Sequence, residues 1–251
     1  MNLFLLLTTL WLAWLLTGTI AEHLARRQLN NIPHRILVSG IRGKSTLVRL
    51  ILAGLRASET VSAGRITGDA PTIIWPDGRE ETQTRRGPAN IREIRRTIRR
   101  ICAGNLCNGR LRAVVIENMA IRPDLQTIVA ERLVRPTLAV FAPDGPDHLE
   151  DNPADPEARQ SLLLSTIPMN TPRLIVDSMT TFADPTLHPH MRPLAGAALE
   201  VIEHVTGAIG HRARAAVLNT ARDLQKLRVY RRDSVAWVDG LSINDPLAAS
   251  Q

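Results

Sequence analysis

The sequence predicts an α/β protein with a doubly wound, mostly parallel sheet, preceded by one transmembrane helix. From His34 onward, apolar runs typical of buried strands alternate with segments of helical periodicity, which favours parallel strands joined by helices. A glycine-containing turn joins the first strand to the first helix, and residues 1–21 carry no charged side chain. We therefore expect a membrane helix over 1–21, a linker over 22–33 and one large α/β domain over 34–251.

The composition agrees with this class. A chain of 251 residues is long enough to bury a sizeable core, and 44% hydrophobic with 3% aromatic residues suits an aliphatic α/β interior. The net charge of +7 fits nucleic acid, a membrane surface or an anionic product equally well. Two cysteines, Cys102 and Cys107, are too few for a disulfide framework, so reduced thiols are expected.

The uncharged segment 1–21 is about as long as the ~20 residues that a helix needs to cross a bilayer. A cleaved signal peptide would carry a basic residue before the apolar run, and none is present. Arg26, Arg27 and Arg35 follow the segment, so the positive-inside rule places the remaining chain in the cytoplasm. The expectation is a single-pass protein of the cytoplasmic (inner) membrane. A core helix of a soluble protein is the alternative, but such helices are usually amphipathic.

The turn between the first strand and helix has the character of a phosphate-binding loop. Glycines let the backbone curl so that successive N–H groups and the helix N-terminus point at an anion. A lysine then supplies charge for the outer phosphates, and a serine hydroxyl supplies a ligand for Mg²⁺. The residues assigned to phosphate binding are Gly40, Ile41, Arg42, Gly43, Lys44, Ser45 and Thr46. The alternative is an ordinary strand-to-helix turn.

Lysine usage supports a special role for Lys44. Lys44 and Lys226 are the only lysines among 31 basic residues, so arginine is used almost everywhere else. We infer that Lys44 occupies a position where a planar guanidinium is too large.

Polar side chains follow the later strands. Glu117 ends the second predicted strand, and Asp147 and His148 follow the third. Ligands of open α/β sheets gather at the carboxyl ends of strands, so Glu117 is a candidate Mg²⁺ partner opposite the loop. Thr67, in a turn of small polar residues, is a further candidate, although a solvated turn is the simpler interpretation of 67–70. Glycines and prolines interrupt the stretch 62–80, which is therefore interpreted as irregular.

A strongly basic helix is predicted from about Asn90 to Cys102, with isoleucines on one face and arginines on the other. Such a helix can bind nucleic acid or anionic lipid, or it can present a solvated face. No aromatic residue is interleaved to stack bases, so nucleic acid is not the expected partner. Further helices are expected over 123–133, 157–167 and 194–227, and further strands over 136–142, 172–177 and 235–240.

Seven motifs occur in one order along the chain: SGIRGKST, ITGDA, IIWPDG, RRGPANI, IENMAIRPDLQ, PDHLED and WVDGLSINDP. Each alone is weak, but together they resemble the Mur ligase superfamily, and within it the membrane-linked poly-γ-glutamate synthase ligases of capsule biosynthesis. The resemblance covers nearly the whole chain, including the leading hydrophobic helix. It implies ATP-dependent amide formation, in which a carboxylate becomes an acyl phosphate that an amine then attacks.

The resemblance also implies residue roles. Lys44 and the loop would hold the triphosphate of ATP, with Mg²⁺ on Ser45, assisted by Thr67. Glu117 and His148 would ligate Mg²⁺ between ATP and the acyl acceptor. The remaining matches are Arg228, as a phosphate-facing arginine, and Asp245, as the acidic contact of the ribose.

The chain departs from the family pattern at three places. Pro143 stands where an asparagine is usual, and no lysine is present where many relatives carry a carbamylated one. The family carries a further carboxy-terminal domain that closes over ATP, and this sequence ends at Gln251, where that domain would begin. Closure excludes water from the acyl phosphate, so either a separate polypeptide supplies the domain or the sequence is incomplete.

The expected partners are small membrane subunits of a polymer synthase and export complex, with glutamate as substrate and poly-γ-glutamate as product. Self-association is left open. Two other functions are compatible with the residues: a different membrane-anchored P-loop ATPase or kinase, and a non-catalytic nucleotide-binding scaffold subunit.

Overall fold

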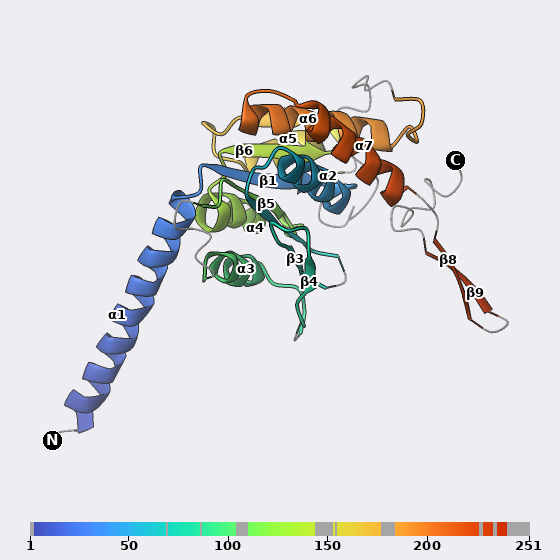
Figure 1. The fold of residues 1–251 in the computed structure, drawn as a ribbon. Coiled ribbons are helices and arrows are strands. Elements are labelled where there is room, and N and C mark those ends of the chain that lie inside the picture. The colour runs from blue at the N-terminus through green and yellow to red at the C-terminus, as the bar shows by residue number, and fades with distance from the viewer. Residues whose placement is uncertain are drawn as a thin grey trace.

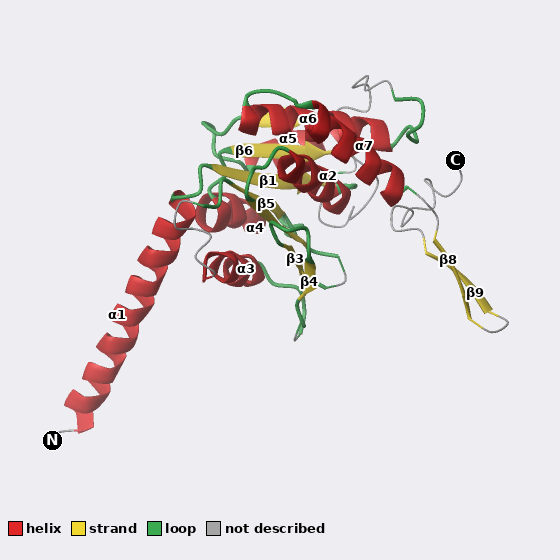
Figure 2. Ribbon diagram, in the orientation of Figure 1, coloured by secondary structure: helices red, strands yellow, loops and turns green. Residues whose placement is uncertain are grey.

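A computed structural model describes the fold of the chain (Figure 1). It describes residues 3–68, 70–85, 87–103, 110–143, 153, 155–176, 184–225, 228–232 and 235–239. Within these residues, a central sheet is covered by helices on both faces, and one long helix projects from the domain (Figure 2).

The central sheet confirms the predicted doubly wound, mostly parallel architecture. Among the described residues its strands are β1 His34–Gly40, β2 Ser62–Ile66, β3 Thr72–Ile74, β4 Glu80–Thr82, β5 Ala113–Glu117, β6 Leu138–Ala142 and β7 Arg173–Ile175. They lie in the order β4-β3-β2-β5-β1-β6-β7. Strands β2, β5, β1, β6 and β7 run parallel, whereas β3 and β4 form an antiparallel edge.

The interpretation of 62–80 as irregular is wrong, because this stretch contains β2 and β3 and the start of β4. All five residues of β2 are buried, and the strand pairs with β5. A Cβ at Gly64 would come within 2.5 Å of Leu52 Cδ1 and 2.9 Å of the Val115 carbonyl oxygen. This glycine therefore belongs to the strand, where it permits close packing of α2 and β5, and does not interrupt it.

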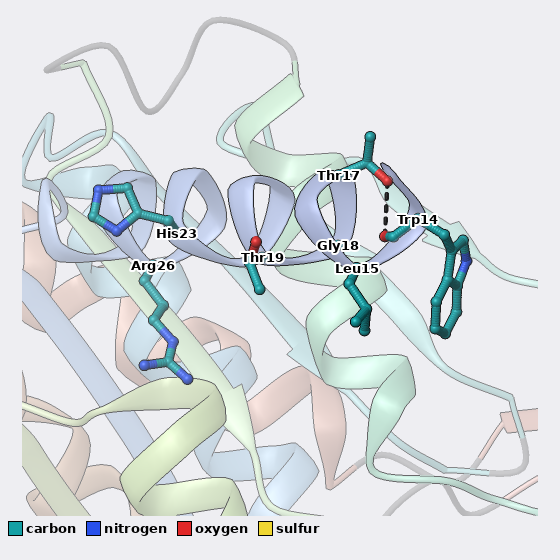
Figure 3. Close-up of a pocket in the computed structure, with 7 residues that line it drawn as sticks. All are labelled: Trp14, Leu15, Thr17, Gly18, Thr19, His23 and Arg26. Carbon is teal, nitrogen blue, oxygen red and sulfur yellow. Dashed lines mark hydrogen bonds between the residues drawn. The ribbon is translucent and has the colours of Figure 1, made fainter. Parts of the chain in front are cut away.

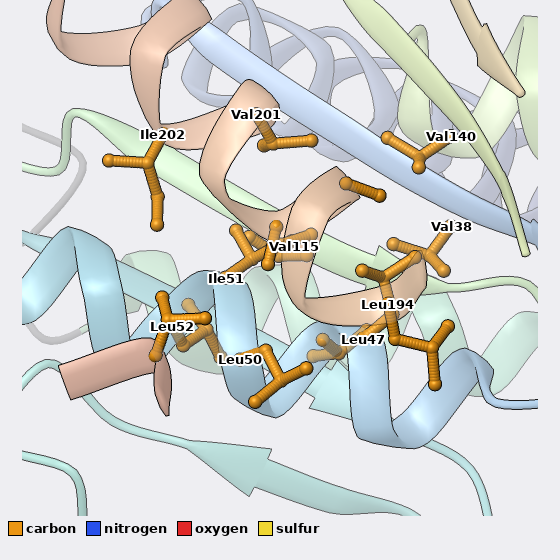
Figure 4. Close-up of a cluster of buried hydrophobic side chains, with 14 of the residues drawn as sticks. Val38, Leu47, Leu50, Ile51, Leu52, Val115, Val140, Leu194, Val201 and Ile202 are labelled. Atoms are coloured by element: carbon orange, nitrogen blue, oxygen red, sulfur yellow. The ribbon is translucent and has the colours of Figure 1, made fainter. Parts of the chain in front are cut away.

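One face of the sheet is covered by α2 Lys44–Ala57, α6 Met191–Thr206 and α7 His211–Leu224. Apolar side chains from α2 and α6 interdigitate with those of the sheet, as the cluster around Ile51, Val115 and Leu194 shows (Figure 4). The helical character expected over 194–227 is confirmed, and the segment contains the two helices α6 and α7. Helix α6 ends at Thr206 and is capped by Gly207, whose φ of +81° is a left-handed conformation that glycine adopts readily.

The opposite face is covered by α3 Arg92–Ala103, α4 Pro123–Ile128, a π-helical turn Val129–Val134 and α5 Pro156–Ser165. These elements confirm the helices predicted near 90–102, 123–133 and 157–167. Ile94, Ile98 and Ile101 of α3 are buried, as its periodicity predicts. Cys102 is disulfide-bonded, so the expectation of a reduced thiol there is wrong.

The projecting helix α1 spans Leu3–Asn30 and therefore continues into the segment assigned to a linker. Its large apolar side chains from Leu3 to Ile20 are exposed, whereas Leu29 at its domain end is buried in the core. Among the described residues, α1 is the one helix that is long and apolar enough to cross a membrane. Near the other end of the chain, β8 Arg228–Arg232 and β9 Val235–Asp239 form a separate antiparallel pair.

Candidate active site

The site lies at the point where the order of the parallel strands changes from one side of the sheet to the other. Strand β1 has β5 on one side and β6 on the other. The chain passes from β1 to β2 on the β5 side, and later from β5 to β6 on the opposite side of β1. Val38 is level with Glu117 of β5, and Gly40 is level with Ala142 of β6. The carboxyl ends of three parallel strands thus meet at a topological switch point, the usual position of a ligand site in such sheets.

The loop between β1 and α2 depends on two glycines with positive φ. Gly40 has a φ of +107°, and a Cβ there would come within 2.5 Å of the Ala142 carbonyl oxygen. Gly43 has a φ of +75° and caps the N-terminus of α2, where a Cβ would approach Leu194 Cδ1 to 3.0 Å. Both glycines are therefore required by conformation and by close neighbours, and they curl the backbone at the helix N-terminus.

The Lys44 side chain folds back onto this loop. Its Nζ donates hydrogen bonds to the carbonyl oxygens of Gly40, at 2.9 Å, and Ile41, at 3.0 Å. The ammonium group is therefore held over the loop that the sequence assigned to phosphates. The Arg42 backbone N–H donates to the Pro143 carbonyl at 3.3 Å, which ties the loop to the end of β6. Thr46 lies in the first turn of α2 beside these residues.

Glu117 lies directly against the loop, as its position at the end of β5 predicts. Its Oε2 accepts hydrogen bonds from the Ser45 hydroxyl and from the Thr67 backbone N–H, each at 2.8 Å. The side chain is only 4% exposed. Thr67 thus contacts Glu117 through its backbone at the end of β2. The structure brings together Lys44, Ser45, Glu117 and Thr67 from three segments that are far apart in sequence.

These residues fit a magnesium ion. Carboxylate and hydroxyl oxygens are hard ligands, and Mg²⁺ is commonly held by one or two carboxylates together with substrate phosphates. In the described part of the chain, no group of three or more histidine, cysteine, aspartate or glutamate side chains could hold a metal ion. Glu117 and Ser45 would therefore provide a partial shell that phosphate and water complete.

Asn118 is a residue of this site that the sequence reasoning did not assign. It is 3% exposed, and its Nδ2 donates to the Ser39 hydroxyl at 3.0 Å. Its backbone N–H donates to the Val38 carbonyl at 2.8 Å, and its Oδ1 accepts from the Ala120 backbone N–H at 3.0 Å. These bonds fix the end of β5 against β1 and so position Glu117. The signal available in the sequence was an asparagine directly after the strand-terminal carboxylate of Glu117.

Arg65 is a second residue that was not assigned. It lies in β2 with 0% exposure, and its Nη2 donates to Glu93 Oε2 of α3 at 2.9 Å. Its Nε and Nη1 make no hydrogen bond within the described structure. Burial lowers the pKa of the Arg65 guanidinium, and the carboxylates of Glu93 and Glu117 oppose that shift. The sequence offered no clear signal for Arg65, because its burial depends on strand β2, which the apolar pattern did not predict.

The structure tests the other assigned residues less directly. His148 and Asp245 lie outside the described residues, and so does Asp147. The backbone of Arg228 lies in β8, level with Asp239 of β9. Strand β6, which precedes His148 in the sequence, ends at Ala142, level with Gly40 of the phosphate loop.

A separate hollow of about 620 Å³ lies along α1 (Figure 3). All its lining residues belong to this one helix: Trp14, Leu15, Thr17, Gly18, Thr19, His23 and Arg26. The Thr17 hydroxyl is already used in a 2.9 Å hydrogen bond to the Trp14 carbonyl. No carboxylate or lysine lines the hollow, and all its lining residues come from the surface of a single helix.

Sequence comparison finds two similar curated proteins. The chain is 30% identical over 164 residues to the capsule biosynthesis protein CapB of Bacillus anthracis, which covers 64% of this chain and 34% of that protein. It is 29% identical over 169 residues to the PGA synthase CapB of Bacillus subtilis, which covers 66% of this chain and 42% of that protein. The chain therefore spans roughly a third to two fifths of these relatives. No protein-family model matches it.

Structure comparison agrees on the fold. E. coli FolC in complex with ADP superposes with a TM-score of 0.55 and 14% sequence identity, over 86% of this chain and 64% of that protein. FolC in complex with DHPP and ADP gives a TM-score of 0.50, also at 14% identity, over 84% and 63%. The chain thus has a FolC-like α/β fold, and the resemblance that its motifs indicated is confirmed by its similarity to the CapB proteins.

Proposed function

We propose that the chain is an ATP-dependent amide ligase of poly-γ-glutamate synthesis, which activates a γ-carboxylate for attack by an amino-acid amine. The observation that carries the proposal is the arrangement around Glu117. A buried carboxylate, a serine hydroxyl and a lysine ammonium converge on a glycine loop at the end of β1. The similarity to two CapB proteins, one of them a PGA synthase, supports the choice of product.

The charges of the site suit the first half of this reaction. A γ-phosphate and a substrate carboxylate repel each other, so their approach requires cationic groups and a bound metal ion. Lys44 would supply positive charge at the outer phosphates, and the backbone N–H groups at Gly43 and the start of α2 would hold them. When bound, Mg²⁺ supplies further charge neutralisation between phosphate and carboxylate. Ser45 and Glu117 would hold it.

The remaining roles follow from position in the motifs. His148 is proposed to join Glu117 as a ligand, Thr67 to assist Ser45, and Arg228 to face phosphate. Asp245 is proposed to contact the ribose. The acyl phosphate would form when a γ-carboxylate oxygen attacks the γ-phosphorus and ADP leaves. An amine nitrogen would then attack the acyl carbon, lose a proton and expel phosphate.

The proposal includes a location. Helix α1 would cross the cytoplasmic membrane once, with the α/β domain on the cytoplasmic side where ATP is available. Small membrane subunits of the synthase would complete the enzyme. The exposed apolar side chains of α1 support the membrane assignment, because water-exposed helices of soluble domains are usually amphipathic.

Phosphate release tests the proposal. Membranes that contain the chain and its partner polypeptides are incubated with ATP and Mg²⁺, with and without glutamate, and phosphate and γ-linked product are measured. We expect release to depend on glutamate and to fall at least ~100-fold in Lys44→Ala and Glu117→Gln, as for the loss of a group that stabilises transition-state charge. Glu157→Gln removes an exposed carboxylate of α5 and serves as the control.

Three results would count against the proposal. Release that is independent of glutamate indicates a plain ATPase. Undiminished γ-linked product in Lys44→Ala would mean that the loop is not the phosphate site. Loss of activity in Glu157→Gln as large as in Glu117→Gln would mean that the effect is not specific to the site.

A further inference from the structure

Four arginines from three elements gather where α1 enters the domain. A small pocket there is lined by Arg26 and two neighbours on α1, by Arg95, Ile98 and Arg99 of α3, and by Arg132 and Leu133 of the π-helical turn. Helix α1 leaves the domain on the side on which α3 lies (Figure 1). Charge from separate parts of the sequence is thus concentrated at the base of the projecting helix.

The distance along α1 from the end of the apolar segment to Arg26 determines how deep the arginines lie relative to a membrane. The uncharged segment ends at Ala21, and Arg26 lies five residues further on. At about 1.5 Å of rise per residue, Arg26 is roughly 8 Å beyond the apolar segment. A headgroup layer is about 5–8 Å thick on each side of a hydrocarbon core of about 30 Å. The guanidinium of Arg26, and those that share its pocket, would therefore lie at headgroup level.

We propose that this cluster, formed by Arg26, Arg95, Arg99 and Arg132, is a binding site for the phosphate of an anionic phospholipid headgroup in the membrane that α1 spans. Guanidinium groups recognise phosphate through paired N–H donors. Basic residues beside a membrane also attract anionic lipid electrostatically. The pocket has a volume of about 20 Å³, room for no more than a water molecule, so the phosphate lies across its mouth.

The apolar residues of the pocket complete the site. Ile98 and Leu133 are buried beneath the arginines and belong to the core of the domain, so α3 and the π-helical turn are held rigidly. Arg99 and Arg132 are exposed at the ends of these rigid supports. The site therefore fixes the orientation of the domain on the bilayer as well as its attachment, because three elements would contact the headgroups together.

Lipid retention tests this inference without any use of enzyme activity. The full chain is inserted into membranes of equal parts phosphatidylcholine and phosphatidylglycerol, extracted in mild detergent, and its bound lipids are counted by mass spectrometry. We expect phosphatidylglycerol to be enriched at least threefold in the wild type and to approach the bulk ratio in Arg95→Gln/Arg99→Gln. Ten millimolar inorganic phosphate, roughly the level of the lipid, is added in a parallel sample and should not displace the lipid.

The matched control is Arg96→Gln/Arg100→Gln. These arginines have the same i, i+4 spacing on the same helix but do not line the pocket, and Arg100 instead pairs with Glu81 of β4. We expect this variant to retain the enrichment. Arg132→Gln, on a different element, provides a second pocket variant if the first does not fold.

Several results would overturn the inference. One is no enrichment in the wild type, and another is equal loss in the pocket and control variants, which indicates net charge alone. Displacement by free phosphate would also overturn it. So would unchanged lipid binding with reduced retention of added poly-γ-glutamate in the pocket variant, since the cluster would then bind polymer.

Discussion

The two faces of the central sheet differ in what they bury. The face under α2, α6 and α7 is packed with apolar side chains, and the phosphate loop lies at its edge. The face under α3 and α4 instead buries the guanidinium of Arg65 and carries the arginines next to α1. The comparison indicates that the first face is stabilised by packing, whereas the second depends on paired charge. Substitutions should therefore act by different mechanisms on the two faces.

The largest effect is expected from Glu93→Leu on the charged face. Glu93 accepts from Arg65 Nη2 at 2.9 Å and from Arg85 Nε at 3.2 Å, so its removal leaves a fully buried guanidinium without its carboxylate partner. We expect the free energy of unfolding in urea to fall by about 3–5 kcal/mol. The control is Glu80→Leu, which removes an exposed partner of Arg49 and should cost less than about 1 kcal/mol.

A double variant separates pairing from packing. Arg65→Leu/Glu93→Leu removes both charges, and replacing a buried ion pair by apolar residues is often neutral. It should therefore recover at least half of the loss caused by Glu93→Leu alone. Equal losses in the single and double variants would mean that the charged face is not maintained by this pair.

The next effect is expected from Gly40→Ala at the edge of the apolar face. The added Cβ would come within 2.5 Å of the Ala142 carbonyl oxygen. The alanine backbone would also have to keep a φ near +107°. We expect a loss of about 3 kcal/mol in the free energy of unfolding, measured by thermal melting. Gly207→Ala shares the positive φ but has no atom within 4 Å, so it should cost about 1 kcal/mol. Similar losses in both variants would show that conformation alone requires Gly40.

The smallest effect concerns pH. Burial, together with the charges of His204, Arg112 and Arg35, lowers the pKa of His34 below its ordinary value of 6.5. The unfolded chain therefore binds this proton at a higher pH than the folded chain, and stability falls as the pH drops below about 7. We expect the melting temperature of His34→Gln to decline less than that of the wild type between pH 7.5 and 5.5. Parallel curves for the two proteins would contradict this expectation.

The sequence was most informative where function and local structure use the same residues. The apolar run before Gly40 and the helical pattern after Lys44 predicted β1, the loop and α2, because strand, turn and helix follow one another in the chain. Glu117 was assigned because strand ends meet in a parallel sheet, and it lies 2.8 Å from Ser45. Both predictions depend on one local pattern and one general rule of topology.

The sequence was least informative where distant segments determine the structure. Strand β2 was missed because Gly64 and Arg65 interrupt its apolar pattern. Gly64 is required by contact with Leu52 and Val115, and Arg65 is tolerated because Glu93 lies beside it, 28 residues away in the chain. Neither contact can be inferred from spacing. The disulfide of Cys102 was missed because two cysteines are too few to indicate a disulfide framework.

The most direct test of the account is the affinity of the full chain for a non-hydrolysable ATP analogue with Mg²⁺, measured for the wild type, Lys44→Ala and Lys44→Arg. Two carbonyl oxygens, of Gly40 and Ile41, hold the compact ammonium of Lys44. We expect the affinity to fall at least ~100-fold in Lys44→Ala and at least ~10-fold in Lys44→Arg, because a guanidinium does not fit the same place. Affinities within twofold of the wild type in both variants would contradict the assignment of this loop to the triphosphate.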